Sequence, residues 1–163
     1  MTQAGPQVWV AGVDDARTVA RLLTGFRDHL GYQRPSGNAI LAGVERLIED
    51  VATEFLLGSP DADTPPAGVA QLRFRQSIWM VRDCLIEDVY VDTDARGAGL
   101  GRALVAHALE RARERGCRRA ELDVSEDNDA GLALYGSFGF EAITDEHGPR
   151  DLYLRVHLDP DDA

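Results

Sequence analysis

Apolar residues recur every three or four positions in two stretches near the start of the chain, a spacing typical of amphipathic helices. The first stretch covers residues 16–30 and follows Asp14 and Asp15, whose side chains suit a helix N-cap, and the second covers residues 40–51. A short apolar run at residues 8–11 precedes both and is predicted to be a strand. The first third of the chain therefore indicates strand, helix, helix.

The rest of the chain combines predicted strands with two further helices. Residues 61–66 lie between the first two of these strands and are so rich in Pro and Asp that we expect a flexible loop there. The acidic residues 159–163 are expected to form a frayed tail. The patterns predict helices at 100–115 and 128–138, strands at 55–57, 69–74, 83–91 and 120–124, a strand start at 140–143, and a closing strand at 152–158.

These elements predict an α/β fold of the α+β type, with a mixed sheet and the order βααβββαβαβ. The middle strands follow one another as hairpins, which makes them antiparallel, whereas helices connect the later strands. The chain has 163 residues, of which 44% are hydrophobic, and this is enough for one continuous core. We therefore expect residues 1–163 to form a single domain.

The net charge of the chain narrows the classes of molecule that it is expected to bind. The chain carries 28 acidic and 17 basic side chains, which gives a formal net charge of -11, and every cation is an arginine. Nucleic acid is not expected as a partner, because duplex binding needs clustered cations, and a cationic small molecule is the better candidate. The absence of lysine excludes Schiff-base chemistry and the lysine of a Walker phosphate loop.

Metal and membrane sites are not expected either. Cys84 and Cys117 match neither a CxxC motif nor the Cys and His spacing of a zinc site. The first residues lack a basic segment leading into an apolar one, and no run approaches about 18 apolar residues. These features predict a soluble, cytoplasmic protein.

Three glycines at alternate positions, Gly97, Gly99 and Gly101, lie between a predicted strand and a predicted helix. Glycine permits left-handed φ values, and the start of a helix offers unpaired N–H groups and the positive end of its dipole, so this loop is a candidate phosphate cradle. Arg96 and Arg102 flank it. A dinucleotide-binding fold is the alternative, but its fingerprint is GxGxxG rather than GxGxG, and too few residues follow the loop to complete such a sheet.

The loop begins an ordered set of residues along the chain: Arg96-x-x-Gly99-x-Gly101, then Asn128, then Tyr135, then Gly139 and Phe140. The set resembles the acyl-CoA loop and the following strand and helix of the GNAT superfamily of N-acetyltransferases. The resemblance covers roughly residues 85–140. Within that superfamily, residues 86–91 resemble the corresponding strand of diamine acetyltransferases.

The resemblance implies transfer of the acetyl group of acetyl-CoA to a primary amine of a small molecule, by direct attack in a ternary complex. Tyr135 would protonate the departing thiolate, and Glu87 would accept the proton of the ammonium. Side chains alternate along a strand, so Asp88 is expected on the opposite face from Glu87. Both acids are candidates for binding the acceptor. The backbone at 89–91 is expected to open at a bulge and pair with the pantetheine arm. The implied cofactor contacts are Val89, Tyr90, Val91, Arg96, Gly97, Ala98, Gly99, Leu100, Gly101, Arg102, Asn128 and Gly131.

Two alternatives stay open. The acceptor could be a protein N-terminus or a protein lysine rather than a small molecule, or the fold could bind acyl-CoA as a sensor without catalysis. The resemblance also makes a homodimer the default expectation.

Overall fold

A five-stranded sheet organises the part of the chain that the computed structural model describes, residues 5–142, 154–156 and 158. The strands lie in the order β1-β2-β3-β4-β5, and all neighbours are antiparallel except β4 and β5, which are parallel. The strands are β1 (Gln7–Val10), β2 (Thr53–Ser59), β3 (Gly68–Ser77), β4 (Val81–Val91) and β5 (Arg119–Glu121). The helices are α1 (Ala16–His29), α2 (Gly37–Leu47), α3 (Leu100–Glu114) and α4 (Asp129–Gly136), with short 3-10 turns at Val13–Asp15 and Thr93–Ala95.

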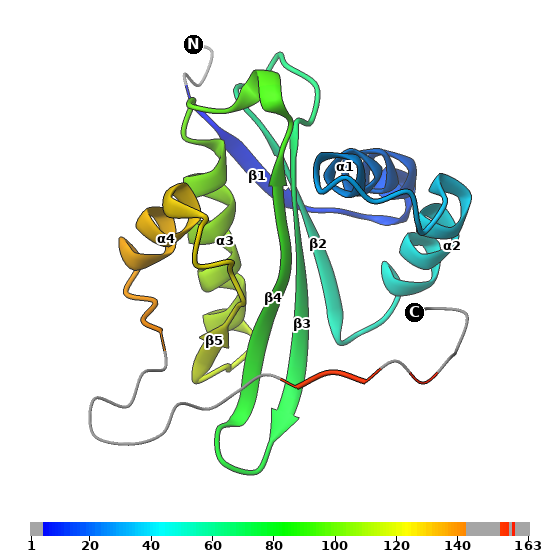
Figure 1. Ribbon diagram of the computed structural model, residues 1–163. Helices are drawn as coiled ribbons and strands as arrows, with labels where there is room; N and C mark the ends of the chain where they lie inside the picture. The colour runs from blue at the N-terminus through cyan, green and yellow to red at the C-terminus, as the bar shows by residue number, and fades with distance from the viewer. Residues whose placement is uncertain (1–4, 143–153, 157, 159–163) are drawn as a thin grey trace.

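Helices cover both faces of the sheet. Figure 1 shows α1 and α2 on one face and α3 on the other, with α4 beside α3. Leu56 and Leu72 are buried against Leu104 on the α3 face, whereas Phe55 is buried with Leu22 on the α1 face. Neighbouring residues of β2 thus serve different cores, as expected for a central strand that is covered on both faces. The predicted mixed α/β fold is confirmed.

Small residues let α3 approach the sheet closely. A Cβ atom added at Gly58 would lie 2.7 Å from Leu100 Cδ1, and one added at Gly68 would lie 2.9 Å from Leu104 Cδ1. Because Leu100 begins α3, this contact fixes where the helix starts relative to the sheet. The glycine-rich loop that precedes α3 is therefore held at the end of β4.

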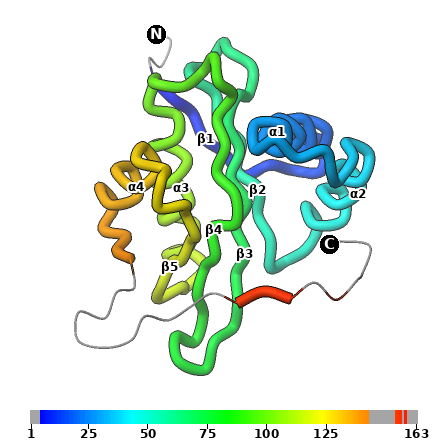
Figure 2. The backbone as a smooth tube through the Cα atoms, viewed as in Figure 1, coloured from blue at the N-terminus to red at the C-terminus, as the bar shows by residue number. Residues whose placement is uncertain are grey.

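A bulge interrupts β4 at Glu87, and not at residues 89–91, where the resemblance implied one and where the pairing with β3 is regular. Gln71 of β3 pairs with Asp88, but the next residue, Leu72, pairs with Ile86, so Glu87 is an extra residue in β4. On its other side β4 pairs with β5 only along Asp83–Leu85. Figure 2 shows the long β3 and β4 hairpin, with β5 beside only the lower part of β4. Beyond Leu85, β4 has no strand partner on the β5 side among the described residues.

The turn between β3 and β4 carries exposed apolar side chains. Ile78 is 94% exposed and Trp79 is 87% exposed. Val81, which closes the turn by pairing with Ser77, has a φ of 63° and is 63% exposed. This left-handed conformation is unfavourable for a β-branched residue.

Several element boundaries differ from the prediction. Helix α2 begins at Gly37 rather than at residue 40, because the Ser36 hydroxyl accepts a hydrogen bond from the Ala39 N–H and caps the helix, and it ends at Leu47 rather than at residue 51. Strand β5 ends at Glu121 rather than at residue 124, because residues 122–124 leave β4. Residues 61–66 form a turn in which the Asp61 carboxylate accepts hydrogen bonds from Asp63 and Thr64, and their flexibility stays a prediction.

The last predicted strands are not formed by the residues that the structure describes. Residues 140–142 and 154–156 are not in a strand. Residue 143, the other residues of the predicted strand at 152–158 except Leu158, and the tail at 159–163 lie outside the described residues. No helix in the described ranges is long and apolar enough to cross a membrane.

Candidate active site

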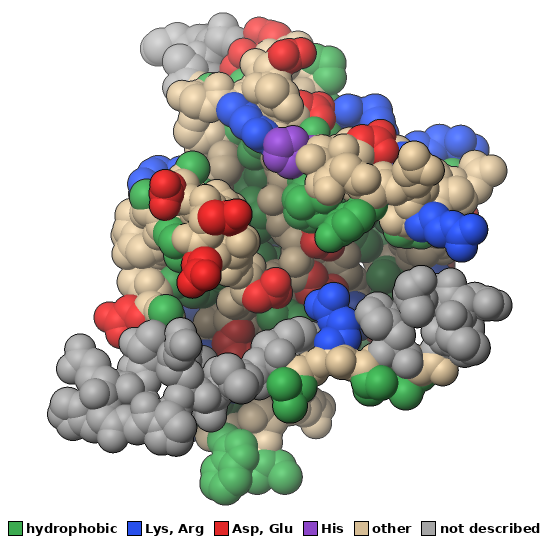
Figure 3. Space-filling model, viewed as in Figure 1, with side chains coloured by type: hydrophobic (Ala, Val, Ile, Leu, Met, Phe, Trp, Pro, Cys, Tyr) green, Lys and Arg blue, Asp and Glu red, His purple; other side chains and the backbone are tan. Residues whose placement is uncertain are grey.

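A cavity of about 1020 Å³ lies where β4 and β5 separate. Its walls come from β4 at residues 86–91, the glycine-rich loop and start of α3, residues 122–125, α4, and the C-terminal end of α1. In the space-filling view, acidic side chains gather along the hollow on this face of the molecule (Figure 3). All but one of the predicted cofactor contacts line this cavity, and the exception, Ala98, lines a neighbouring hollow instead.

The glycine-rich loop and the start of α3 present backbone N–H groups to the cavity. Gly97 and Gly99 have φ values of 85° and 82°, so both need the left-handed conformation that glycine allows. The first bond of α3 runs from the Ala103 N–H to the Gly99 carbonyl, at 3.0 Å. The amides of residues 100–102 therefore precede the helical hydrogen bonds and can meet an anion.

Two arginines add positive charge beside this loop. Arg96 Nε donates a hydrogen bond to the Val91 carbonyl at 3.0 Å, and its guanidinium lies 5.8 Å from the centre of the Tyr90 ring. The Arg102 guanidinium lies 5.3 Å from the centre of the Phe138 ring. These contacts hold both cations beside the helix start, where they would reinforce its attraction for phosphate.

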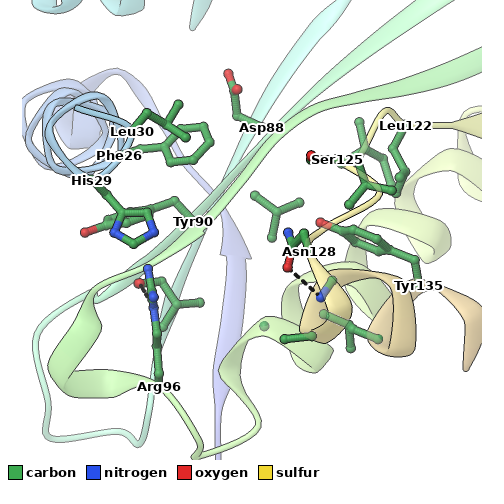
Figure 4. Close-up of a pocket in the computed structure, with 18 of the residues that line it drawn as sticks. Phe26, His29, Leu30, Asp88, Tyr90, Arg96, Leu122, Ser125, Asn128 and Tyr135 are labelled. Carbon is green, nitrogen blue, oxygen red and sulfur yellow. Dashed lines mark hydrogen bonds between the residues drawn. The ribbon is translucent and has the colours of Figure 1, made fainter. Parts of the chain in front are cut away.

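Helix α4 places Tyr135 on the wall opposite β4 (Figure 4). Asn128 caps this helix, since its Oδ1 accepts a hydrogen bond from the Gly131 N–H at 2.9 Å. A Cβ atom at Gly131 would lie 2.6 Å from Asn128 Nδ2, so glycine lets this cap lie close to the helix. Partial burial and the nearby Asp123 carboxylate raise the pKa of Tyr135, so the phenol keeps its proton at neutral pH. No residue of α4 is buried by the part of the chain that the structure describes.

Glu87 and Asp88 both line the cavity, so the prediction that they lie on opposite faces of the strand is wrong. The alternation of side chains assumes a regular strand, and the bulge at Glu87 breaks it. The two carboxylates nevertheless have different surroundings. Glu87 accepts hydrogen bonds from Arg73 Nε at 2.9 Å and from Arg73 Nη2 at 3.1 Å, and it also accepts one from Gln71.

The Asp88 carboxylate has no hydrogen bond or ion pair with any described residue. Burial raises its pKa first, and the negative charges of Glu87 and Asp123 raise it further. Figure 4 shows its carboxylate projecting from β4 between the aromatic side chains of α1 and the α4 wall. A carboxylate with a raised pKa and no partner among the described residues accepts a proton more readily than an ordinary aspartate.

The C-terminal end of α1 forms an apolar wall that the sequence patterns did not reveal as part of a site. Phe26 and His29 lie 5.5 and 6.2 Å from Tyr90, measured between ring centres, and Leu30 lines the cavity with them. A Cβ atom at Gly25 would lie 3.3 Å from the Tyr90 ring, so α1 approaches β4 closely. Helical spacing marked these residues only as one side of an amphipathic helix. Arg155 also lines the cavity and was likewise not expected there.

The cysteines do not belong to this site. Cys84 is buried in the α3 core, Cys117 packs against the same core, and neither lines the cavity. Burial raises the pKa of Cys84 to about 12, so its thiol stays protonated. Among the described residues there is no group of three or more His, Cys, Asp or Glu side chains that could hold a metal ion.

Comparison with known proteins places this geometry among acetyltransferases. Residues 27–140 match the Acetyltransferase (GNAT) family. Over 95 residues the chain is 30% identical to a thialysine N-epsilon-acetyltransferase of Bos taurus, an alignment that covers 57% of this chain and 56% of that protein. The chain thus spans little more than half the length of this relative.

Solved structures share the fold over almost the whole chain. A putative acetyltransferase from Arthrobacter sp. FB24 is 27% identical with a TM-score of 0.80, and the match covers 93% of this chain and 96% of that one. An aminoglycoside N-acetyltransferase solved in complex with CoA is 16% identical with a TM-score of 0.76, and the match covers 96% of both chains. The second likeness concerns the fold alone.

Proposed function

Since the chain belongs to the GNAT acetyltransferase family, we propose that it transfers the acetyl group of acetyl-CoA to a primary amine of a small molecule, by direct attack in a ternary complex. One observation carries the proposal. A single cavity joins the anion-binding start of α3 to Asp88 on one wall and Tyr135 on the other. A phosphate cradle, a proton acceptor and a proton donor therefore share one continuous space.

The residues around the loop fit a CoA pyrophosphate. The left-handed Gly97 and Gly99 expose the amides of residues 100–102, and Arg96 and Arg102 supply the cations. Bound there, acetyl-CoA would supply an activated thioester. Beyond Leu85, β4 has no strand partner on the β5 side among the described residues, as strand-like recognition of the pantetheine arm requires. An amide among residues 89–91 would polarise the thioester carbonyl.

We assign proton acceptance to Asp88 rather than to Glu87. An aliphatic ammonium has a pKa of about 10.4, so the acceptor amine must lose a proton before it can attack. Both oxygens of Glu87 already accept hydrogen bonds from Arg73 or Gln71, so they are less available to an incoming ammonium. Asp88 lacks such partners among the described residues, and its raised pKa supports the assignment. Glu87, which is bonded to Arg73 and Gln71 of β3, would then hold the bulge of β4 in one orientation.

Tyr135 is proposed as the proton donor to the departing thiolate. Its pKa is raised, so it carries its proton at the pH of the reaction, and it lies across the cavity from β4. A phenol has a pKa of about 10 and a thiol one of about 8.5, so the transfer needs direct contact between the two groups. Homodimerisation and a cytoplasmic location stay predictions from the resemblance and the composition.

A thiol-release assay with acetyl-CoA and a panel of primary amines tests the proposal, together with calorimetric titration of CoA. We expect CoA binding and turnover of at least one small amine. Binding without turnover of any small amine, peptide N-terminus or peptide lysine would instead indicate a sensor. Absence of both binding and turnover would refute the proposal.

A further inference from the structure

We propose that Arg73 makes the acceptor site selective for amines with a single ammonium group, because it neutralises the second carboxylate of the site, Glu87. The inference rests on the proposed function and adds the class of acceptor. It concerns a residue of β3 that does not line the cavity. Arg73 therefore acts through Glu87 rather than on the acceptor directly.

The ion pair between Arg73 and Glu87 has the forked geometry that guanidinium and carboxylate groups favour. Arg73 Nε lies 2.9 Å from Glu87 Oε1, and Arg73 Nη2 lies 3.1 Å from Glu87 Oε2. The buried Gln71 side chain donates a further hydrogen bond to Oε2. The Arg73 and Glu87 side chains are 37% and 26% exposed, so the pair lies partly withdrawn from water.

The charges around the acceptor end of the cavity leave room for one ammonium. Asp88 has no partner among the described residues, and Asp123 influences both Asp88 and Tyr135 electrostatically. Both carboxylates line the same cavity as Tyr135, and we assign them to the reacting ammonium. The cation Arg155 also lines the cavity.

Among the described residues, the other walls add no carboxylate to the cavity. The α1 wall presents Phe26, His29, Leu30 and Tyr32. With Asp88 and Asp123 assigned to the reacting ammonium, a second ammonium on the same molecule would meet Glu87, whose charge is already balanced by Arg73. A diamine would lose the hydration of its second charge without gaining a free carboxylate.

The test compares an amine and a diamine of equal chain length, pentylamine and 1,5-diaminopentane, or the matched pair whose length turns over fastest. The measured quantity is the kcat/KM of the diamine divided by that of the monoamine. For the wild type we expect a ratio below one. Arg73→Gln frees the Glu87 carboxylate and should raise the ratio about fivefold to tenfold, the effect of one nearby charge in a partly hydrated site.

The reciprocal variant has the opposite sign and does not depend on the folding of Arg73→Gln. Glu87→Gln leaves the Arg73 cation uncompensated and should lower the ratio below that of the wild type. In the double variant, Arg73→Gln with Glu87→Gln, the ratio should return towards the wild-type value. Arg75→Gln is the matched control: Arg75 lies on the same strand, pairs with Asp83 and Glu121, does not line the cavity, and should leave the ratio unchanged.

A wild-type preference for the diamine would overturn the inference, as would a gain in Arg73→Gln that persists in the double variant. So would a Glu87→Gln ratio equal to that of the wild type. These outcomes differ from failure of the proposed function, in which the wild type acetylates no amine of either kind.

Discussion

Replacing Asp88 with Asn separates the catalytic use of this carboxylate from its cost to stability. The substitution keeps the shape of the side chain and removes its charge and its ability to accept a proton. Loss of a positioned general base lowers rates about 10²-fold to 10⁴-fold, which corresponds to about 3–5 kcal/mol of activation free energy. We expect a fall in kcat/KM within this range for every amine that the wild type acetylates.

The pH dependence follows from the direction of the Asp88 shift. Burial and neighbouring negative charges raise its pKa, so the folded protein binds this proton more tightly than the unfolded chain does. In the wild type, kcat/KM should therefore fall with decreasing pH at a value above that of an ordinary aspartate. This acid limb should disappear in Asp88→Asn, whose remaining activity should depend on pH only through the acceptor amine and Tyr135.

Stability should change in the opposite direction. A carboxylate whose pKa is raised by folding destabilises the native state wherever it is ionised, so its unfavourable effect is present at neutral pH and is lost as pH falls through the raised pKa. Asp88→Asn should therefore have the larger free energy of unfolding at neutral pH, and the difference should shrink in acid. Thermal melts measured at several pH values would test this.

The matched comparison is Glu87→Gln, which removes a neighbouring carboxylate of similar size. Because Glu87 is already engaged by Arg73 and Gln71, we expect its loss to lower kcat/KM with monoamines less than about tenfold, an effect on positioning rather than on proton transfer. If Glu87→Gln is the more damaging change and Asp88→Asn keeps the wild-type acid limb, the base has been assigned to the wrong residue.

Three further substitutions, one of them with a control variant, test other parts of the structure. Tyr135→Phe should lower kcat about 10²-fold without changing the Kd of CoA, whereas an unchanged kcat would remove Tyr135 as the proton donor. Gly99→Ala places a Cβ at a φ of 82°, which costs about 1–2 kcal/mol, and calorimetry should show weaker CoA binding. The control is Gly43→Ala in α2, where the added Cβ meets no atom within 4 Å, and this variant should bind CoA normally. Val81→Gly relieves a similar strain at an exposed turn, although the entropy that glycine loses on folding offsets part of the gain. The free energy of unfolding measured in urea should rise by about 0.5–1 kcal/mol. A fall would show that Val81 makes a stabilising contact.

The parts of the site that could be predicted are those that local sequence specifies. The glycine-rich loop, the Asn128 cap and Tyr135 lie within short segments, where glycine conformations and helix capping follow from a few neighbouring residues. The order of elements through α4 could be predicted for the same reason, because each helix has its own apolar spacing.

The relation between Glu87 and Asp88 could not be predicted, because it depends on how two strands pair. A bulge adds one residue to β4 only when β3 lies beside it, and nothing in the alternation of residues 83–91 marks the position. The pairing of Arg73 with Glu87 joins residues that are 14 positions apart, and the α1 wall meets β4 across more than 50 positions. Such contacts are decided by the packing of the whole sheet.

The proposed proton acceptor and proton donor belong to elements that differ in local stability. Asp88 belongs to a strand that separates two buried cores, whereas Tyr135 belongs to a helix with no residue buried by the described chain. Amides of α4 should therefore exchange their hydrogens through small local openings, and those β4 amides that bond β3 only through openings close to global unfolding. On warming, delivery of the proton to the thiolate should fail while the sheet is still intact, so loss of activity should precede loss of the fold.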